Sequence, residues 1–586
     1  MEVTRTFDLL DRYATKFADK NDVFAGKVKG QWVKYGVNDY INNSNNISYG
    51  LMALGLKKGD RVATISNNRP EWNFVDMGLA QAGFLHVPIF STLNKQGYKE
   101  ILDHAEVNAI FVSDKRIYNI LKSIAPKLIF TFEEVEGAKP WTEVLDLGLK
   151  SADQFKHILA SSKKQIKPTD PVTLIYTSGT TGKPKGVLLS HQNLVSNAIA
   201  ASEIFKLQPH QRYLSILPIC HVGERLACYQ TQYSGCSIYY AENVATIAND
   251  LKDVKPHGFG AVPRILEKVY DKIIAKGQKL TGVKKKLFFW ALNLGLRYEI
   301  NGVNGLWYEF QLKIANKLIF SKWREAMGGN VAAIGIGGAA LQPKLEKVFW
   351  AAGIKLLNMY GSTETATIIT LNRQHLPDLR LGSIGTSIKN VQVKISDDGE
   401  ILCKGPNVML GYYKNEKATR EVIDEDGWFH TGDIGVLEDG KFLHITDRKK
   451  EIFKLSNSIY VSPQTIENLF KESPYIDQVM VVGEGEKFAS ALISPNFEEL
   501  KTWCNTNGIR FENKHELVKS PEISKFFNEI VKEFNKSLSK DEQVKRFRIV
   551  VDEWTPDTGE LSPTLKLKRE ILNEKYSELI DEIFYK

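Results

Sequence analysis

Short apolar runs alternate with helical segments over residues 59–131, and this alternation constrains the fold more than any other feature. Strands are predicted for Gly59–Ser66, Leu85–Ile89, Ala109–Val112 and Leu128–Thr131. Helices are predicted between them, at Trp72–Gly83, Tyr98–Ala105 and Ile117–Ile124. This spacing favours a parallel, doubly wound sheet. At 586 residues the chain is also too long for a single hydrophobic core, so we expect two or more domains.

The remaining segments differ in the length and charge of their predicted elements. Amphipathic helices are predicted at residues 7–21 and 39–55, and a polar, lysine-rich connector at residues 149–168. A helix at Asn193–Phe205, an apolar segment at Tyr213–Leu217 and a helix-rich region from Val262 to about Met327 follow. Beyond Asp447 the predicted elements are shorter and more charged, with strands at Ile476–Val482, Phe488–Ile493 and Phe547–Val551 and helices at Gln464–Phe470, Phe497–Cys504 and Ile523–Ser537. We therefore place a domain boundary between residues 446 and 447, before a small α+β domain.

A loop rich in glycine and hydroxyl groups interrupts an apolar run between Thr173 and His191. Its glycines are Gly179, Gly182 and Gly186, and its hydroxyl and lysine donors are Thr177, Ser178, Thr180, Thr181, Lys183 and Lys185. Glycines permit a close backbone approach, and consecutive N–H groups form a concave anion site, which favours a polyphosphate ligand over a simple surface turn. It is not a Walker A loop, because only two residues separate Gly179 from Gly182 and a proline follows Lys183.

Further segments carry candidate binding groups. Val331–Ala340 matches a G-x-G-x-x-A fingerprint, but the expected acid about 20 residues on is missing. We interpret it as a glycine turn at a strand end, where α/β sheets bind ligands. Tyr360–Thr365 supplies an aromatic ring, hydroxyls and a carboxylate, and Thr431–Ile434 presents a carboxylate suited to a ribose diol, although Gly-Asp most often forms a turn. Thr558–Arg569 is a turn-rich basic loop.

Composition narrows the range of partners. The net charge of +8 arises from 77 basic and 69 acidic residues, which permits anionic substrates or an anionic lipid surface. The sequence has no zinc-finger spacing, RNP-like motif or basic arm, so no nucleic-acid partner is expected. Cys220, Cys228 and Cys236 recur every eight residues beside His221, and core packing is favoured there over a metal site.

Neither a signal peptide nor a membrane span is predicted, so we expect a cytoplasmic protein whose membrane contact, if any, is peripheral. Lys284–Trp290 sets three lysines beside an aromatic block. This pattern is compatible with an interfacial helix that binds a lipid surface, on the inner face of a membrane. We favour the alternative, an amphipathic helix that packs on its own domain with solvated lysines.

Taken together, these segments resemble the adenylate-forming superfamily of acyl-CoA synthetases, adenylation domains and beetle luciferases. The resemblance extends from the region of Gly59 to Arg569, and its motifs occur in the order Tyr176–Gly186, Gly337–Leu341, Tyr360–Thr365, Thr431–Asp433, Asp447–Lys454 and the lysine loop. Four features are similar to the long-chain fatty acyl-CoA synthetase branch: Leu217–Arg225, Ala261–Lys268, the helical insertion after it, and Ser562–Arg569. The resemblance implies an α/β fold in which residues 1–446 form doubly wound sheets plus a small distorted barrel, and residues 447–586 a small mobile domain.

The resemblance also implies roles for individual residues. The β- and γ-phosphates of ATP would be cradled by Thr177, Ser178, Gly179, Thr180, Thr181, Gly182 and Lys183. The rest of the nucleotide would be bound by Gly338, Ala339, Ala340, Tyr360, Gly361, Ser362, Asp433 and Arg448, the last two on the ribose. Thr363 would contact the α-phosphate, and Glu364, with Thr181, would hold Mg²⁺. Lys566 would neutralise the attacked phosphate, and Lys450 would be the hinge. Lys454 would lie on the CoA side, and His221 would either line the acyl entrance or be a core histidine.

The implied reaction joins a long-chain fatty acid to coenzyme A in two halves. The acid attacks the α-phosphorus of ATP to give acyl-adenylate and pyrophosphate, and the CoA thiol then displaces AMP. Positioning and charge stabilisation would drive both halves, without a covalent enzyme nucleophile. Asn457 and Ser458 replace the glycine that relatives usually have where pantetheine would pass. A ligase for another acid (medium-chain, or loaded onto a carrier-protein thiol) and a non-catalytic lipid-surface protein are the alternatives, and the chain would be a monomer or a homodimer.

Overall fold

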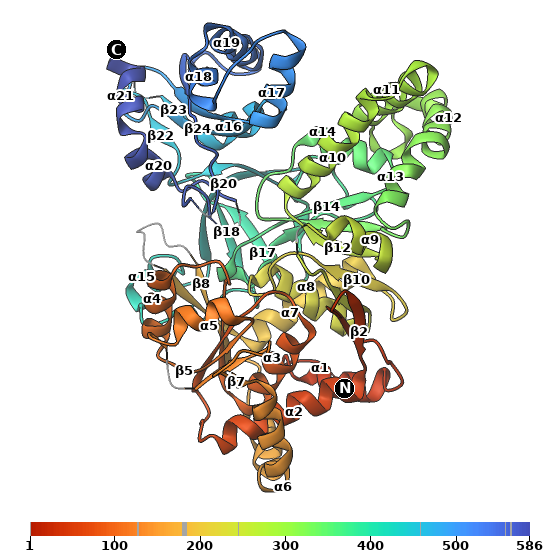
Figure 1. Ribbon diagram of the computed structural model, residues 1–586, viewed down its shortest axis with the longest axis vertical. Coiled ribbons are helices and arrows are strands. Elements are labelled where there is room, and N and C mark those ends of the chain that lie inside the picture. Colours follow the sequence, from red (N-terminus) through yellow and green to blue (C-terminus); the bar gives the residue numbers. More distant parts are fainter. Residues whose placement is uncertain are drawn as a thin grey trace. The chain divides into compact units, whose positions relative to one another are not determined.

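The computed structural model describes residues 2–125, 128–177, 184–243, 245–457, 459–556, 558–562 and 565–585. They form two compact units (Figure 1). The first comprises Met1–Val393 and Cys403–Phe429, and the second comprises Lys394–Leu402 and His430–Lys586. Both units combine sheets with helices, which confirms the predicted α/β class.

The first unit contains an eight-stranded sheet with the order β19-β9-β8-β4-β3-β5-β6-β7. Its outer strands are β19 (Gly411–Tyr412), β9 (Lys185–Ser190) and β8 (Pro171–Thr177) on one side and β7 (Lys139–Pro140) on the other. Its parallel centre consists of β3 (Arg61–Ile65), β4 (Leu85–Ile89), β5 (Val107–Val112) and β6 (Leu128–Thr131). These strands alternate with α3 (Pro70–Ala82), α4 (Lys95–Ala105) and α5 (Lys115–Leu121). Apolar side chains of β3 and β5 point alternately into two cores, one shared with α4 and α5 and the other with α2 (Val37–Ala53) and α3. The predicted doubly wound sheet is therefore confirmed, because helices cover both faces of it.

A second, nine-stranded sheet has the order β16-β15-β14-β13-β12-β10-β11-β1-β2. Its parallel strands are β10 (Arg212–Ser215), β11 (Ser237–Tyr240), β12 (Gly258–Ala261), β13 (Ala333–Ile336) and β14 (Lys355–Tyr360). The short strands β15 (Thr370–Leu371) and β16 (Thr386–Ser387) close one edge. Helices α8 (Val222–Tyr233), α9 (Ile247–Val254) and α14 (Pro343–Ala351) lie between these strands in the sequence. Helix α7 (His191–Phe205) precedes β10 and agrees with its prediction.

The other edge of this sheet is a hairpin of β1 (Phe24–Val28) and β2 (Gln31–Tyr35) that sequence analysis did not predict. Its two-residue turn is Lys29-Gly30, with φ of 50° and 79°. Two positive φ values in a two-residue loop give the turn a twist that matches the flanking strands. The sequence signal is weak because lysine stands where asparagine or aspartate usually marks such a turn.

Residues 149–165, expected to lie in a polar connector, are helical instead. They belong to α6 (Thr142–Gln165), which packs on α2 (Val37–Ala53). A Cβ on Gly148 would lie 2.0 Å from the carbonyl oxygen of Asn46, so the helices meet at backbone distance. The prediction was wrong because only Val144, Gly148 and Leu159 of α6 are buried, too few to produce an apolar period.

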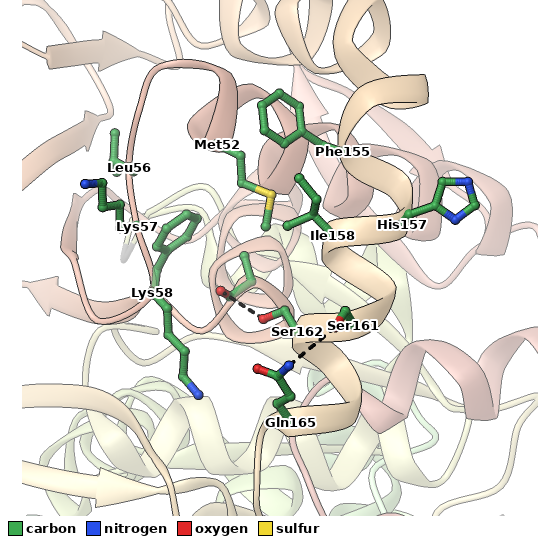
Figure 2. Close-up of a pocket in the computed structure, with 12 residues that line it drawn as sticks. Met52, Leu56, Lys57, Lys58, Phe155, His157, Ile158, Ser161, Ser162 and Gln165 are labelled. Atoms are coloured by element: carbon green, nitrogen blue, oxygen red, sulfur yellow. Dashed lines mark hydrogen bonds between the residues drawn. The ribbon is translucent and has the colours of Figure 1, made fainter.

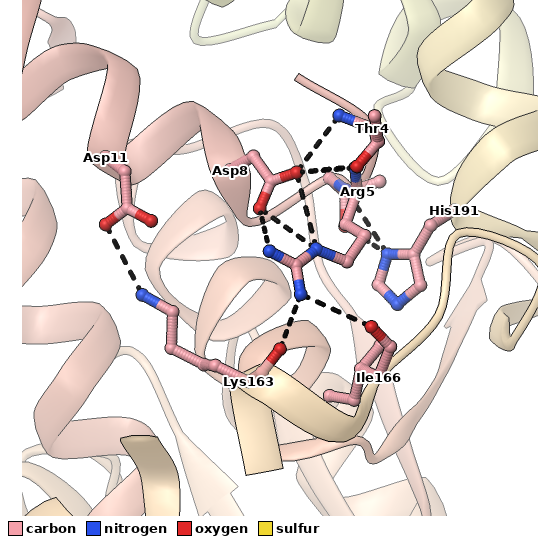
Figure 3. A network of polar contacts seen from close by, with 8 residues as sticks. Thr4, Arg5, Asp8, Asp11, Lys163, Ile166 and His191 are labelled. Atoms are coloured by element: carbon pink, nitrogen blue, oxygen red, sulfur yellow. Dashed lines mark hydrogen bonds and ion pairs between the residues drawn. The ribbon is translucent and has the colours of Figure 1, made fainter. Parts of the chain in front are cut away.

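A polar network joins the end of α6 to the N-terminal segment before α1 (Asp8–Lys16) and to α7 (Figure 3). Arg5 forms an ion pair with Asp8 at 2.7 Å and donates hydrogen bonds to the carbonyls of Lys163 and Ile166 at 2.5 and 3.3 Å. His191 Nδ1 accepts the N–H of Thr6 at 3.2 Å, and burial lowers the pKa of His191 to about 3. The neutral imidazole therefore fixes the start of α7, directly after the glycine-rich hairpin.

A helical insertion follows β12 and agrees with the predicted helix-rich region. It contains α10 (Pro263–Gln278), α11 (Gly282–Leu296), α12 (Gly305–Ala315) and α13 (Ser321–Ala326). Lys284, Lys285 and Lys286 on α11 are exposed, whereas Phe288 is buried and Trp290 partly buried. This agrees with the favoured interpretation of α11 as a helix packed on its own domain. No helix in the described part of the chain is both long and apolar enough to cross a membrane.

A four-stranded sheet has the order β17-β18-β20-β21 and lies mostly in the second unit. Its strands are β17 (Gln392–Ile395), β18 (Glu400–Lys404), β20 (Phe429–Glu438) and β21 (Phe442–Arg448). The small distorted barrel was expected within residues 1–446, a range that includes three of these strands. A three-stranded sheet follows, made of β24 (Ile476–Val482), β25 (Ser490–Pro495) and β26 (Arg546–Ile549). The domain boundary predicted between residues 446 and 447 falls inside β21. That the chain on its two sides has different functions stays a prediction.

Helices α16 (Pro463–Phe470), α17 (Phe497–Thr506), α18 (Lys514–Lys519) and α19 (Pro521–Asn535) complete the core of this small α+β region. Three of them were predicted within a few residues, and α18 was not. The chain ends in two further unpredicted helices, α20 (Arg569–Lys575) and α21 (Ser577–Tyr585), which cover the other side of the three-stranded sheet. A short hairpin of β22 (Phe453–Lys454) and β23 (Tyr460–Val461) precedes α16.

Candidate active site

In the sequence, the glycine-rich loop connects two antiparallel strands of the first unit. Strands β8 (Pro171–Thr177) and β9 (Lys185–Ser190) are antiparallel, and Thr177 pairs with Lys185 at the base of the loop. The candidate phosphate ligands Ser178, Gly179, Thr180, Thr181, Gly182 and Lys183 lie outside the described residues. β8 runs parallel to β4, so Thr177 stands at the carboxyl edge of the sheet, the edge at which α/β proteins bind ligands.

The two other glycine-containing candidate segments of this unit end neighbouring parallel strands. Gly338, Ala339 and Ala340 follow β13 and are exposed, and Tyr360 is the last residue of β14. Gly338 has φ of 86°, a conformation that a side chain would strain. Because β13 and β14 are parallel, both segments lie at one carboxyl edge, as the sequence predicts for a nucleotide site.

The chain after Tyr360 folds back sharply on itself. A Cβ on Gly361 would lie 1.6 Å from the carbonyl oxygen of Thr367, so only glycine fits there. The N–H of Thr367 donates to the Ser362 carbonyl at 3.0 Å, and the N–H of Ile369 to that of Tyr360 at 2.7 Å. This compact turn holds Thr363 and Glu364 at the strand end, partly exposed.

Glu364 is tied to the glycine-rich hairpin through Tyr412, which sequence analysis missed. The Tyr412 hydroxyl donates to Glu364 Oε1 at 2.9 Å, and the Lys185 ammonium lies 5.0 Å from the centre of the Tyr412 ring. Burial and the neighbouring carboxylate raise the pKa of Tyr412 above its ordinary value, so the hydroxyl stays a donor. β19 (Gly411–Tyr412) pairs with β9, which fixes this ring beside the hairpin.

The donor set around Glu364 fits Mg²⁺ only in part. No group of three or more His, Cys, Asp or Glu side chains among the residues that the structure describes could hold a metal ion. A magnesium ion here would therefore combine the Glu364 carboxylate with phosphate oxygens, a combination typical of Mg²⁺ in nucleotide sites. Cys220, Cys228 and Cys236 are all buried free thiols, which agrees with core packing.

His221 is a half-buried residue at the carboxyl edge of the nine-stranded sheet. It is the N-cap of α8, and its Nδ1 accepts the N–H of Gly223 at 3.1 Å. Its ring lies 6.5 Å from that of Phe90, which directly follows β4 of the other sheet. His221 therefore stands where the carboxyl edges of the two sheets meet, a position compatible with an acyl entrance.

Asn68 joins the same two edges, and no sequence signal marked it. From the loop after β3, its Nδ2 donates to Ser215 Oγ at 3.1 Å and to the Leu217 carbonyl at 2.6 Å. Its Oδ1 accepts the N–H of Ile219 at 2.8 Å. Asn68 thereby positions the loop that leads to His221.

A buried charge network lies under this edge. Arg225 on α8 is fully buried and donates to Asp76 at 2.5 Å and to Thr173 Oγ1 on β8 at 2.7 Å. His86 lies 2.7 Å from Asp76. Burial alone would raise the pKa of Asp76, but Arg225 and His86 hold it below its ordinary value. The network therefore anchors α3, α8 and the strand that carries the glycine-rich loop.

Glu224, next to Arg225, is a buried carboxyl group without a cationic partner in any contact that the structure records. The Tyr213 hydroxyl donates to its Oε1 at 3.2 Å. Burial raises the pKa of Glu224 to about 8, so the group is mostly protonated at neutral pH.

The candidate ribose ligands belong to the second unit. Asp433 on β20 is the cross-strand neighbour of Arg448 on β21, and Arg448 Nε lies 3.2 Å from Asp433 Oδ1. Gly432, with φ of 73°, donates its N–H to Glu400 at 2.8 Å. The structure thus brings Asp433 and Arg448 together, as expected if both act on one diol.

The expected hinge and CoA-side residues follow β21. Lys450 is exposed in the turn after the strand. Lys454 is also exposed, and its ammonium lies 5.5 Å from the centre of the Tyr460 ring. Asn457 Oδ1 accepts the N–H of Ile459 at 3.2 Å, while Ser458 lies outside the described residues.

Lys566 is exposed on a tight turn. Its N–H donates to Ser562 Oγ at 3.0 Å, and its carbonyl accepts the N–H of Ser562 at 2.8 Å. Arg569, three residues on, binds both carboxylate oxygens of Glu467 at 2.7 Å and lies 3.2 Å from Glu451. Glu451 directly follows Lys450, so the base of the Lys566 turn is bound to the segment of the expected hinge.

A surface cavity of about 570 Å³ lies elsewhere in the first unit (Figure 2). Lys57, Lys58, Ala82 and Phe84 line it, and they precede β3 and β4. It therefore opens at the amino ends of these strands, opposite the edge where α/β sheets bind ligands. We assign the candidate site from the motifs at the carboxyl edge and not from this cavity.

Comparison with known proteins identifies the family. Residues 10–413 match the AMP-binding enzyme family, and residues 450–586 match the AMP-binding enzyme C-terminal domain. A long-chain-fatty-acid–CoA ligase of Mycobacterium bovis is 31% identical over 96% of this chain and 94% of its own. A peroxisomal long chain acyl-CoA synthetase of Arabidopsis thaliana is 32% identical over 94% of this chain and 81% of its own. The chain belongs to the AMP-binding, adenylate-forming enzyme family.

Solved structures share the fold. An anthranilate CoA ligase in complex with anthranoyl-AMP has a TM-score of 0.72 at 18% identity, covering 98% of this chain and 99% of that one. A Mycobacterium tuberculosis fatty acyl CoA synthetase has a TM-score of 0.61 at 20% identity, covering 98% and 99%. Family membership thus defines an ATP-dependent, acid-adenylating ligase that binds ATP and AMP.

Proposed function

We propose that this protein is a long-chain-fatty-acid–CoA ligase that forms AMP. The observation that carries the proposal is the nearly full-length similarity to relatives with long-chain names, at 31% and 32% identity. The position of the motifs supports it, because Thr177, Gly338 and Tyr360 lie at carboxyl ends of parallel strands, where α/β sheets commonly bind ligands.

In the first half-reaction the chain's own residues would hold ATP and the acid in line. Thr177–Lys183 would bind the β- and γ-phosphates, Thr363 would contact the α-phosphate, and Lys566 would neutralise charge on the attacked phosphorus. Glu364 would hold Mg²⁺, which when bound offsets phosphate charge. The acid's oxygen bonds to the α-phosphorus as pyrophosphate leaves, so preorganised cations and N–H donors are the required catalysts.

In the second half-reaction the CoA thiol would attack the acyl carbonyl, and AMP would leave. Gly338, Ala339, Ala340, Tyr360, Gly361 and Ser362 would keep the adenine side in place, and Asp433 and Arg448 the ribose. The small domain, divided from the first near residues 446 and 447, would turn about Lys450 between the two halves. Lys454 would then stand on the CoA side, and His221 at the acyl entrance.

The test is pyrophosphate release by the full chain with fatty acids of graded length, in the presence of ATP, Mg²⁺ and CoA. Each buried methylene contributes about 0.8 kcal/mol, so kcat/KM should rise about fourfold per carbon until the acyl site is filled. The proposal expects this rise to continue into long chains. A maximum at short chains, or turnover only with a carrier-protein thiol in place of CoA, would instead establish the alternative acid ligases.

A further inference from the structure

Helix α12 is apolar around most of its circumference, yet only one side of it is buried. Tyr308 and Leu312 face the interior, and the Tyr308 hydroxyl donates to the Leu294 carbonyl on α11 at 2.7 Å. On the opposite side Leu306 is 90% exposed and Trp307 is 70% exposed. A helix that is apolar all round is ordinarily buried, so the exposed side indicates an interaction surface.

The exposed apolar side chains form one stripe, which we call the α12 stripe. Its members recur at intervals of one, three or four residues and are Val303, Leu306, Trp307, Phe310, Ile314 and Leu318. This spacing places Leu306, Trp307, Phe310 and Ile314 on one face of α12. Val303 lies in the turn before the helix and Leu318 in the π-helical turn after it. The rings of Trp307 and Phe310 stack with their centroids 5.6 Å apart. The stripe is therefore a continuous apolar surface and not a scatter of single exposed residues.

Cations accompany the α12 stripe. Residues 282–322 contain seven Lys or Arg and only two acidic residues. Lys313 and Lys317 are exposed and follow Phe310 and Ile314 by three residues, which places them along the same face. The three exposed lysines that begin α11 belong to the helix that packs beside α12 (Figure 1).

We propose that the α12 stripe inserts into the surface of an anionic lipid bilayer, with these lysines at the level of the headgroups. An apolar face that carries tryptophan and is bordered by lysines is typical of helices that lie in a membrane interface. A second copy of this chain is a less suitable partner for the α12 stripe, because a twofold contact would bring two cationic surfaces together. The inference rests on exposed side chains of residues 282–322 and is independent of the proposed substrate.

The test is flotation of the full chain with vesicles of phosphatidylcholine alone or of equal parts phosphatidylcholine and phosphatidylglycerol. We expect the chain to float with the anionic vesicles and to be released by high salt. Replacing Leu306, Trp307 and Phe310 by serine should abolish flotation. Lys313→Gln with Lys317→Gln should weaken partitioning about 30-fold, from about fivefold per lysine at an anionic surface.

The matched control is Leu149→Ser with Lys150→Gln on α6, an exposed apolar residue beside an exposed lysine, and it should float like the parent. Pyrophosphate release with detergent-dispersed fatty acid should be unchanged in every variant, which shows that each is folded. The proposal is overturned if the parent does not float, or if the triple variant floats as well as the parent. It is also overturned if sedimentation without lipid shows a dimer that the triple variant abolishes.

Discussion

Arg225 and Lys566 are two cations that the molecule holds in opposite ways. Arg225 is fully buried in the first unit, and its guanidinium donates to Asp76, Thr173 and Tyr229. Lys566 is exposed in the second unit, on a turn whose backbone is fixed through Ser562. The buried cation fixes the strand before the glycine-rich loop, whereas the exposed one carries its long side chain at the surface of the second unit. A structural cation and a candidate catalytic one are thus distinguished by burial and not by sequence context.

The largest effect is expected from Arg225→Ala. It would leave Asp76 buried beside His86 without its cation, which should lower the free energy of unfolding by about 3–5 kcal/mol. Arg420→Ala, which breaks the exposed pair with Glu416, should cost less than about 1 kcal/mol. Denaturant unfolding of both variants measures the difference. Equal losses of unfolding free energy in the two variants would contradict the structural role assigned to Arg225.

A pH effect of intermediate size is expected from Glu224. Its pKa rises from 4.5 to about 8 on folding, so the folded chain keeps a proton that the unfolded chain releases. Its contribution to stability is present below pH 4.5 and is lost progressively as the pH rises toward 8.

Glu224→Gln removes this titration. The stability difference between parent and variant should therefore change with pH in that window and be constant below it. Glu203→Gln, at a half-exposed glutamate paired with Lys389, is the control and should leave the pH profile almost unchanged. If the stabilities of the parent and of Glu224→Gln changed with pH in parallel, the folded chain would not hold Glu224 in its protonated form.

The smallest effect is expected from Asn68→Ala. Loss of its bonds to Leu217 and Ile219 should lower stability by about 1–3 kcal/mol, because the partners are partly desolvated. If the loop before His221 lines the acyl site, KM for the acid should rise more than kcat falls. Asn68→Asp keeps the acceptor for Ile219 but sets a carboxylate oxygen against the Leu217 carbonyl oxygen, so it should lose at least as much stability as Asn68→Ala. Steady-state kinetics with varied fatty acid concentration measure both constants. An unchanged KM would contradict a role of Asn68 in positioning the acyl site.

Sequence patterns predicted the elements whose burial is nearly continuous. Strand β4 is buried throughout and β6 is buried except at its first residue, and both were predicted residue for residue. Helix α6 was missed because its contact with α2 depends on small residues such as Gly148, which leave no apolar period. Hairpin β1–β2 was missed because its turn lacks the usual residues.

The residues of the candidate site form the same two groups: those that a local sequence pattern marks and those that no local pattern marks. The glycine and carboxylate motifs at strand ends were predicted because each is a short contiguous run of residues after a predicted strand. Their roles in binding stay predictions. Asn68 and Tyr412 were not found, because each is a single residue whose partner is distant in sequence and adjacent only after folding. Asn68 contacts Leu217, 149 residues away, and Tyr412 contacts Glu364, 48 residues away. No local pattern encodes such pairs.

The most direct test of the account is Lys566→Ala, assayed separately in the two half-reactions. We predict that adenylation, measured as pyrophosphate release, falls about 10²–10³-fold. Thioester formation from supplied acyl-adenylate and CoA should stay close to that of the parent, and Lys568→Ala on the same loop should leave both halves nearly intact. Equal loss of both halves in Lys566→Ala would contradict the assignment of Lys566 to adenylation.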